Sequence, residues 1–210
     1  KCFIMMLWHQ NIRFKLNRLE PVLFFYRKLS AENTLYLDRD GVLNKVVLRD
    51  GEISSPRIED EIQIADDVVY LANNRIVSDW NLVVITNQPD VSRKYIDDQF
   101  LEGINNLILK YVPINAVFYC PHLKESMCEC RKPKTGIIDR FRQDYPSAVK
   151  KECMIGDQQT DFECAQLACI SFITREREYN AELVRKSEFN VSSLKQVAAM
   201  LELLKETRRT

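Results

Sequence analysis

Net charge, membrane-length apolar segments and repeats are all missing from this sequence. Lys plus Arg and Asp plus Glu each number 30, so the formal net charge is zero. A neutral chain has no overall electrostatic attraction for nucleic acid or an anionic membrane, and neither is expected as a partner. No apolar run approaches the length of a membrane-spanning helix, and there is no internal repeat or low-complexity tract. The 210 residues, 46% of them hydrophobic, suffice for one globular domain with or without an appendage.

A disulfide framework is also missing. The seven cysteines are odd in number, and Cys153, Cys164 and Cys169 stand among apolar residues, where free cysteine behaves as a small hydrophobic side chain. This usage is typical of a reducing compartment, so we expect a cytoplasmic protein.

The N-terminal segment lacks the marks of a signal peptide. Charged residues such as Arg13 and Glu20 interrupt its apolar start, and no small-residue cleavage pattern follows. We interpret residues 1–33 as an appended helix or arm with an apolar face. It would dock on the main domain, expected over 34–210, or on a second subunit, which would allow self-association.

From residue 34 onward, short β-prone apolar runs alternate with stretches of helical periodicity. This alternation predicts a parallel sheet covered by helices on both faces. The expected strands are 34–38, 82–86, 115–119, 153–156 and 170–174. The expected helices lie near 66–80, 97–111, 136–145, 160–168 and 192–206. A long excursion over 41–65 follows the first strand, and its Asp50-Gly51 pair indicates a hairpin turn.

Polar residues stand where three of the expected strands end. Asp38 and Asp40 follow the first strand, Thr86 and Asn87 end the second, and Asp157 follows a later one. In open parallel sheets, ligands bind beyond the carboxyl ends of the strands. We therefore expect these side chains to meet at one edge of the sheet.

The carboxylates suggest metal-assisted chemistry at phosphorus. Asp38 and Asp40 are two residues apart, so on a strand they point to the same side and need a counter-charge. One can attack phosphorus while the other handles a proton. Asp157 is expected to complete an oxygen shell for Mg²⁺ with Asp38, and Asp161 to orient the loop, cap the next helix or support the ligands. The alternative for Asp38 and Asp40 alone is an Asp-rich turn.

Several side chains are candidates for binding an anion. The Thr86 hydroxyl and the Asn87 amide can donate hydrogen bonds to phosphoryl oxygens, with an ordinary polar loop as the alternative. Four basic loop residues are candidates for substrate contact, with a solvated surface charge as the alternative for each: Arg49, Arg57, Arg93 and Lys94.

A compact metal-ligand pattern lies within eleven residues: Cys120, His122, Cys128 and Cys130. Three thiolates and one imidazole match a closed tetrahedral Zn²⁺ site, which we expect to be structural because no coordination position is left open. The alternatives are scattered buried cysteines and a redox role for Cys128 and Cys130. The chain has only two histidines, and one falls inside this pattern.

Arg131 and Lys132 directly follow this pattern, and a metal-clamped loop would hold both rigidly. A lysine near Asp38 would offset carboxylate repulsion and neutralise a transferring phosphoryl group. An arginine suits bidentate binding of a second phosphate or another anion. A solvated basic run is the usual alternative.

Four segments occur in a fixed order: DRDGVLN, TNQPDVSR, CPH with CECRKPK, and GDQQTD. With them, the chain over about residues 34–175 resembles the haloacid dehalogenase (HAD) superfamily of phosphohydrolases. More narrowly, it resembles the zinc-containing branch with D-glycero-D-manno-heptose-1,7-bisphosphate phosphatase and the histidinol-phosphate phosphatase domain. The resemblance implies a Rossmann-like α/β HAD fold with a small cap or flap and a zinc-binding loop.

The resemblance also implies roles for single residues. Asp38 would be the nucleophile that forms an aspartyl-phosphate, and Asp40 would be the general acid and base. Mg²⁺ would be held by Asp38, the backbone carbonyl of Asp40 and Asp157. Thr86 and Lys132 would bind the phosphoryl group. Three further residues would contact the substrate: Arg39, Asn87 and Arg131.

The expected activity is Mg²⁺-dependent hydrolysis of a small phosphorylated metabolite, with heptose 1,7-bisphosphate first and histidinol phosphate second. A nucleic-acid 3′-end phosphatase is third, because the chain has no net charge and no basic–aromatic stripe. A catalytically silent binding module is an alternative of another class, although the intact Asp38 and Asp40 pair argues against it. Two departures from the bisphosphatases concern the substrate: Lys94 replaces a frequent glycine, and the excursion over 45–58 is longer than expected.

Overall fold

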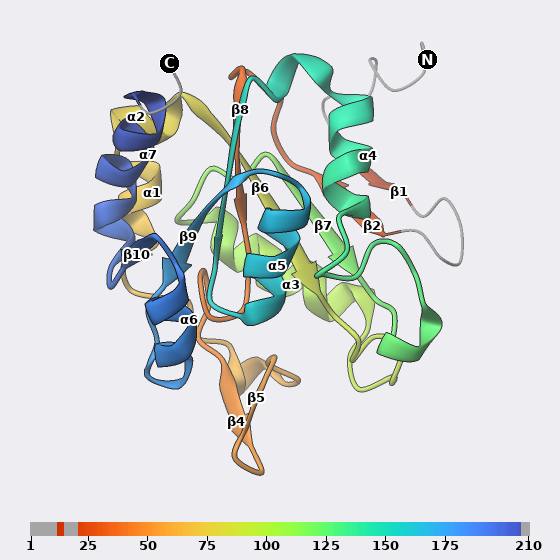
Figure 1. Cartoon of the computed structure of the whole chain (residues 1–210). Coiled ribbons are helices and arrows are strands. Elements are labelled where there is room, and N and C mark those ends of the chain that lie inside the picture. Colours follow the sequence, from red (N-terminus) through yellow and green to blue (C-terminus); the bar gives the residue numbers. More distant parts are fainter. Residues whose placement is uncertain (1–11, 15–20, 207–210) are drawn as a thin grey trace.

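The computed structural model describes residues 12–14 and 21–206, and its centre is an eight-stranded sheet (Figure 1). The strand order is β1-β2-β7-β6-β3-β8-β9-β10. The strands from β7 to β10 run parallel, whereas β2 pairs antiparallel with β7, and β1 antiparallel with β2. The strands are β1 Ile12–Phe14, β2 Val22–Phe25, β3 Asn33–Leu37, β6 Trp80–Asn87, β7 Ala116–Cys120, β8 Lys151–Gly156, β9 Ser171–Arg175 and β10 Phe189–Val191.

All five expected strands are present, as β3, β6, β7, β8 and β9, and each of their ends lies within two residues of its predicted position. The predicted parallel sheet is thus confirmed. β7 is buried along its whole length and β6 in all but its last residue, because helices cover both faces of the sheet.

The helices divide between the two faces. They are α1 Val69–Ala72, α2 Arg75–Ser78, α3 Asp98–Leu109, α4 Gly136–Asp144, α5 Gln159–Leu167, α6 Ala181–Lys186 and α7 Val197–Glu206, with short 3₁₀ turns η2 Glu59–Glu61, η3 Lys124–Ser126, η4 Pro146–Ala148, η5 Glu178–Asn180 and η6 Leu194–Gln196. Leu35 and Leu37 of β3 belong to a core that includes α1, α2, α3 and α7, whereas Tyr36 belongs to a core with α4 and α5. Because successive side chains of a strand point to opposite faces of the sheet, β3 contributes residues to both cores.

Two expected helices differ in detail. The helix expected over 66–80 is divided into α1 and α2, because Asn74 caps α2 by accepting a hydrogen bond from the backbone N–H of Ile76. The helix expected over 192–206 starts with η6, where Ser193 is the cap, and continues as α7. No helix in the described part of the chain is long and apolar enough to cross a membrane.

The N-terminal segment requires a correction. We expected 1–33 to be an appended helix or arm docked on a domain that starts at residue 34, but Val22–Phe25 form β2, which is itself a strand of the main sheet. Val22 and Phe24 are buried in a cluster with Tyr119, so the apolar face covers the edge of β7. Residues 1–11 and 15–20 of the expected arm lie outside the described residues, and self-association remains a prediction.

The excursion after β3 contains the expected hairpin, formed by β4 Val47–Arg49 and β5 Glu52–Ser54. Asp50 and Gly51 in its turn have φ of 53° and 81°, the left-handed conformation that an Asp-Gly hairpin turn needs. The hairpin projects away from the sheet below the carboxyl end of β3 (Figure 1). It corresponds to the small cap or flap that the resemblance implied.

Candidate active site

The candidate active site lies at the carboxyl ends of β3, β6 and β8. β3 ends just before Asp38, β6 contains Thr86 near its end, and β8 ends just before Asp157. β3 lies between β6 and β8 in parallel register, so the three strand ends are neighbours. A cleft of about 260 Å³ opens here, and its lining includes Asp38, Asp40, Thr86 and Lys132. Motifs far apart in sequence are thereby brought together.

Three buried carboxylates face one another in this site. Oxygens of Asp38, Asp157 and Asp161 lie within 4.8 Å of one another. Burial raises the pKa of Asp38 to about 7, against the opposing effect of Lys132. Burial, together with the charges of Asp38 and Asp161, raises the pKa of Asp157 to about 8. Such a cluster calls for a cation.

Asp157 has the atom that fits a cation best. Its Oδ1 is buried and accepts no hydrogen bond from any described residue. Carboxylate oxygens are the ligands that Mg²⁺ prefers, and an unpartnered one beside Asp38 suits that ion. The residues present therefore fit Mg²⁺.

Asp161 is occupied by other bonds. Its Oδ2 accepts hydrogen bonds from the backbone N–H groups of Asp157 at 3.2 Å and Gln158 at 3.0 Å, at the start of α5. Its Oδ1 pairs with Lys132 at 2.7 Å. Asp161 therefore caps the helix and supports the site, as expected, which leaves Asp38 and Asp157 to face a metal ion.

Lys132 is the buried cation of the site. Its Nζ donates to Asp38 Oδ1 at 2.6 Å and to the Ile85 carbonyl at 2.8 Å, besides the ion pair with Asp161. Burial alone would lower the pKa of Lys132, but Asp161 and Asp38 raise it above its usual value. Lys132 stays charged and can neutralise an anion bound next to Asp38.

Asn87 positions Lys132 from the end of β6. The Asn87 Nδ2 donates to the Lys132 carbonyl at 3.1 Å, and the Lys132 backbone N–H donates to Asn87 Oδ1 at 3.0 Å. Asn87 lines the cleft, but both of its polar atoms are used in this clamp. Its Nδ2 group has a second hydrogen, so Asn87 positions Lys132 and its expected contact with substrate stays a prediction.

Asp40 is held by three donors. Its Oδ2 accepts hydrogen bonds from Ser55 Oγ and Gln88 Nε2, both at 2.7 Å, and from Arg39 at 3.0 Å. Burial raises the pKa of Asp40, but Arg39 and these hydrogen bonds lower it more, so the result lies below its usual value. Gln88 Nε2 also donates to Thr86 Oγ1 at 3.0 Å, which links the carboxylate to the expected phosphate ligand.

Arg39 requires a correction. It was expected to contact substrate, but its side chain is only 1% exposed and its guanidinium group pairs with Asp40. Arg39 thus fixes the charge of Asp40 from inside the protein, and the prediction of substrate contact is wrong.

Gly41 is required by the close approach of its backbone to Asp157. Its φ is +91°, and a Cβ atom there would lie 2.1 Å from Asp157 Oδ2. A side chain at this position would displace the carboxylate that faces the expected metal ion.

Three residues after β9 complete the surroundings of Asp157, and the sequence reasoning missed them. Tyr179 donates its hydroxyl hydrogen to Asp157 Oδ2, and Asn180 Nδ2 donates to the Asp157 carbonyl at 2.8 Å. Arg177 Nε donates to the Gly41 carbonyl at 2.7 Å. Their signal was the strand end itself: 170–174 was an expected strand, and the residues beyond it reach the same edge.

The four predicted metal ligands form a buried cluster at the end of β7 and in the loop that follows it. His122 Nδ1 lies 3.2 Å from Cys130 Sγ and 3.4 Å from Cys120 Sγ, and Cys128 Sγ lies 3.6 Å from both other thiols. A hydrogen bond from Cys130 lowers the pKa of Cys120 to about 6, although burial raises it. Such a set can hold a metal ion.

The basic candidates have different positions. Arg131 lines the cleft, and its NH1 donates to the His122 carbonyl at 3.2 Å. Arg93 also lines the cleft and pairs with Asp90 at 2.8 Å. The other three lie away from it: Arg49 pairs with Glu61, Arg57 pairs with Asp90 at 2.7 Å, and Lys94 lines a second groove.

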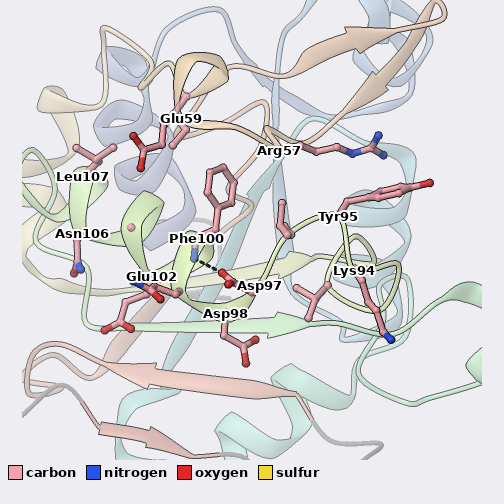
Figure 2. A pocket seen from close by; sticks show the side chains of 15 residues that line it. Arg57, Glu59, Lys94, Tyr95, Asp97, Asp98, Phe100, Glu102, Asn106 and Leu107 are labelled. Atoms are coloured by element: carbon pink, nitrogen blue, oxygen red, sulfur yellow. Dashed lines mark hydrogen bonds between the residues drawn. The ribbon is translucent and has the colours of Figure 1, made fainter.

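The second groove lies between η2 and α3 and has a volume of about 1170 Å³ (Figure 2). Its lining contains four acidic side chains, Glu59, Asp97, Asp98 and Glu102, and two basic ones, Arg57 and Lys94. Figure 2 shows Arg57 above Tyr95, and Arg57 Cζ lies 4.2 Å from the ring centroid. The groove is therefore more acidic than basic.

The parallel sheet, the Asp38–Asp157 pair and the buried Lys132 define a HAD-type phosphatase, an enzyme that hydrolyses phosphate monoesters. A family model described as polynucleotide kinase 3 phosphatase matches residues 43–190, more than half of the chain. The chain therefore belongs to this family, and the resemblance stated from the motifs is confirmed.

Curated relatives are named as bisphosphate phosphatases. The probable D-glycero-D-manno-heptose-1,7-bisphosphate 7-phosphatase of Thermoplasma volcanium is 28% identical over 145 residues, covering 66% of this chain and 95% of the relative. The D-glycero-alpha-D-manno-heptose-1,7-bisphosphate 7-phosphatase of Photorhabdus laumondii is 31% identical over 147 residues, covering 64% and 77%.

Solved structures share the fold. The D,D-heptose 1,7-bisphosphate phosphatase from B. bronchiseptica, solved with magnesium and phosphate, superposes with a TM-score of 0.65 at 23% identity, covering 82% of this chain and 99% of the other. A HAD-like phosphatase from Mesorhizobium loti gives 0.62 at 19% identity, covering 78% and 83%.

Proposed function

We propose that this phosphatase depends on Mg²⁺ and acts on a sugar bisphosphate, D-glycero-D-manno-heptose 1,7-bisphosphate. The observation that supports this substrate is the similarity to relatives with that name. The matched region covers 95% of the length of one relative and 77% of another. The cleft supports it, because Arg131 lies on its wall with a guanidinium group suited to a second phosphate.

Asp38, Asp157 and the backbone carbonyl of Asp40 would hold Mg²⁺. The unpartnered Oδ1 of Asp157 and the close carboxylates support this assignment. When bound, the ion supplies positive charge that offsets the carboxylates and a phosphoryl group.

Each side chain of the site then has its own role in the reaction. Asp38 attacks phosphorus, and the bond to the leaving oxygen breaks as an aspartyl-phosphate forms. Asp40 donates a proton to the leaving oxygen, and later takes one from the water that hydrolyses the intermediate. Lys132 and Thr86 bind phosphoryl oxygens and balance their charge. A phosphate dianion beside Asp40 raises the pKa of that group, which offsets the effect of Arg39.

The Cys–His cluster is proposed to hold a structural Zn²⁺. Bonds of about 2.3 Å in a tetrahedron separate two thiolates by roughly 3.8 Å. The three sulfur–sulfur distances in the cluster, 3.3 to 3.6 Å, are close to that spacing. No disulfide joins the described cysteines, which also supports a cytoplasmic location that cell fractionation would test.

A nucleic-acid 3′-end phosphatase is the second candidate, favoured by the description of the matching family. The second groove argues against it, because four acidic side chains would repel the phosphates of a polymer that extended beyond the cleft. A small anion that stays inside the cleft avoids this repulsion.

A phosphate-release assay tests the proposal with heptose 1,7-bisphosphate, histidinol phosphate, a 3′-phosphorylated oligonucleotide and p-nitrophenyl phosphate. We expect Mg²⁺-dependent turnover, with the highest kcat/KM for the heptose bisphosphate. Preference for the oligonucleotide would make the second candidate correct. A folded, metal-loaded protein with no turnover of any of the four would be a silent binding module.

The substitution Arg131→Ala tests recognition of a second anionic group. We expect kcat/KM to fall about 10- to 100-fold for the bisphosphate and less than about threefold for p-nitrophenyl phosphate, which has no second phosphate. Arg140→Ala, which removes an exposed arginine paired with Asp144 on α4, is the control. Equal losses on both substrates would refute a recognition role.

A further inference from the structure

Ser55 follows β5 and reaches back from the base of the hairpin to the centre of the site. Its hydroxyl group donates a hydrogen bond to Asp40 Oδ2 at 2.7 Å. Among the donors to this carboxylate, Arg39 is its neighbour in sequence and Gln88 lies on the loop after β6. Ser55 is the one that comes from the hairpin segment.

The segment that carries Ser55 is fixed from both sides. Arg49 NH1 donates to the Ser55 carbonyl at 2.8 Å and pairs with Glu61. The backbone N–H of Arg57 donates to Glu61 Oε2 at 2.7 Å. Pro56, which lies between Ser55 and Arg57 in the sequence, is buried. These contacts therefore fix the backbone around Ser55 and hold its hydroxyl group in place.

Arg57 joins this turn to the loop after β6. Its Nε donates to Asp90 Oδ2 at 2.7 Å, and its guanidinium group lies over the Tyr95 ring (Figure 2). Asp90 is 4% exposed, so this ion pair is anchored on a buried carboxylate. The same loop begins with Gln88, the other neutral donor to Asp40, so the contacts on Asp40 are held in one connected frame.

The chemical nature of the three donors differs. The Arg39 guanidinium and the Gln88 amide NH₂ can only donate to Asp40. The Ser55 hydroxyl donates to Asp40 Oδ2, and it keeps this contact when the transferred proton sits on Oδ1, because the other oxygen of a neutral carboxyl group still accepts. A residue that serves both forms suits a group used first as an acid and then as a base.

We propose that Ser55 is a positioning residue that aims the carboxyl group of Asp40 at the leaving oxygen of the substrate. This inference rests on the proposed function of Asp40 as general acid. A contribution of this kind appears in the step that breaks the ester bond, and it grows as the leaving group becomes more basic, because a poor leaving group needs the proton more.

The test compares Ser55→Ala with wild type on phenyl phosphate and p-nitrophenyl phosphate, which differ mainly in the basicity of the leaving group. We expect kcat/KM to fall about tenfold for phenyl phosphate and less than about threefold for p-nitrophenyl phosphate. A merely structural role would lower both values by the same factor.

Two further variants make the result specific. Ser55→Thr keeps the hydroxyl group and should keep the wild-type ratio between the two substrates. Ser78→Ala removes an exposed hydroxyl on α2, which donates to the Arg75 carbonyl at 2.6 Å away from the cleft, and it should leave both values unchanged. Thermal melting of each variant checks that the fold is retained.

The outcomes separate this inference from the proposed function. Equal losses in Ser55→Ala, no loss, or a Ser55→Thr variant that behaves like Ser55→Ala would overturn the role of Ser55 while wild type remains active. Absence of turnover in wild type would instead overturn the proposed function.

Discussion

Asp38 stands between one cation and two anions, and this balance decides its reactivity. Lys132 lies 2.6 Å from its Oδ1, and carboxylate oxygens of Asp157 and Asp161 lie within 4.8 Å in the same cluster. A nucleophilic carboxylate must be ionised, yet burial raises the pKa of Asp38 to about 7. Lys132 is the side chain that opposes this effect before any metal ion binds.

The substitution Asp38→Asn removes the attacking charge and retains the shape. We expect turnover to fall at least about 1000-fold, because an amide oxygen cannot form the aspartyl-phosphate. The melting temperature without Mg²⁺ should not fall, since one of three crowded carboxylates is gone. Asp60→Asn, at an exposed position in η2, should change neither value. Substantial remaining turnover would show that another group is the nucleophile.

At the scale of elements, the central strands could be predicted because their apolar runs are continuous and are followed by polar strand ends. β2 could not, because a run of four residues with alternate burial is too short to tell from one face of a helix. Its strand identity comes from pairing with β7, a contact made across about ninety residues of sequence.

Some residues of the site could likewise be predicted from the sequence, and others could not. Asp38, Thr86 and Asp157 could be predicted because each lies at the end of a strand, and the metal ligands because their spacing is local. Ser55 has no local signal, because its partner Asp40 lies 15 residues earlier in the sequence and the two meet only when the hairpin segment folds back. Arg39 was assigned to the wrong partner because sequence does not tell which side of a turn a side chain faces.

The metal-binding loop is the element that carries Arg131 and Lys132. The substitution Cys128→Ser removes one of its four expected ligands, so we expect zinc content to fall from about one ion per chain. Because Lys132 and Arg131 directly follow the cluster, kcat/KM should fall at least about tenfold. Metal analysis and the phosphate-release assay measure both.

The matched control is Cys169→Ser, an exposed cysteine outside the cluster, which should keep both zinc and activity. Full activity of a zinc-free Cys128→Ser variant would contradict a structural metal. A metal-free wild type with a Cys128–Cys130 disulfide would favour the redox alternative.

On the scale of the whole molecule, folding itself gathers the carboxylates. β3 and β8 are central neighbours in the sheet, so closing the core forces Asp38 and Asp157 together. Their pKa values of about 7 and about 8 lie above those of the unfolded chain. Between about pH 4 and those values, the folded state binds more protons than the unfolded state, so the Mg²⁺-free protein loses stability as pH rises.

Mg²⁺ binding should therefore depend on pH in the opposite direction. The ion needs ionised carboxylates, so below about pH 7 it must displace protons from Asp38 and Asp157. We expect the Mg²⁺ concentration that gives half of the thermal stabilisation to fall up to about tenfold for each proton displaced per pH unit between about pH 6 and 8. The measurement is thermal melting of dialysed protein, titrated with Mg²⁺ at several pH values, so it does not depend on turnover. Asp157→Asn should weaken the stabilisation and flatten its pH dependence, because one titrating ligand is lost. A midpoint that stays constant across this range would mean that these carboxylates are already ionised without the ion, and that the crowding of Asp38 and Asp157 is not what draws a cation into the cleft.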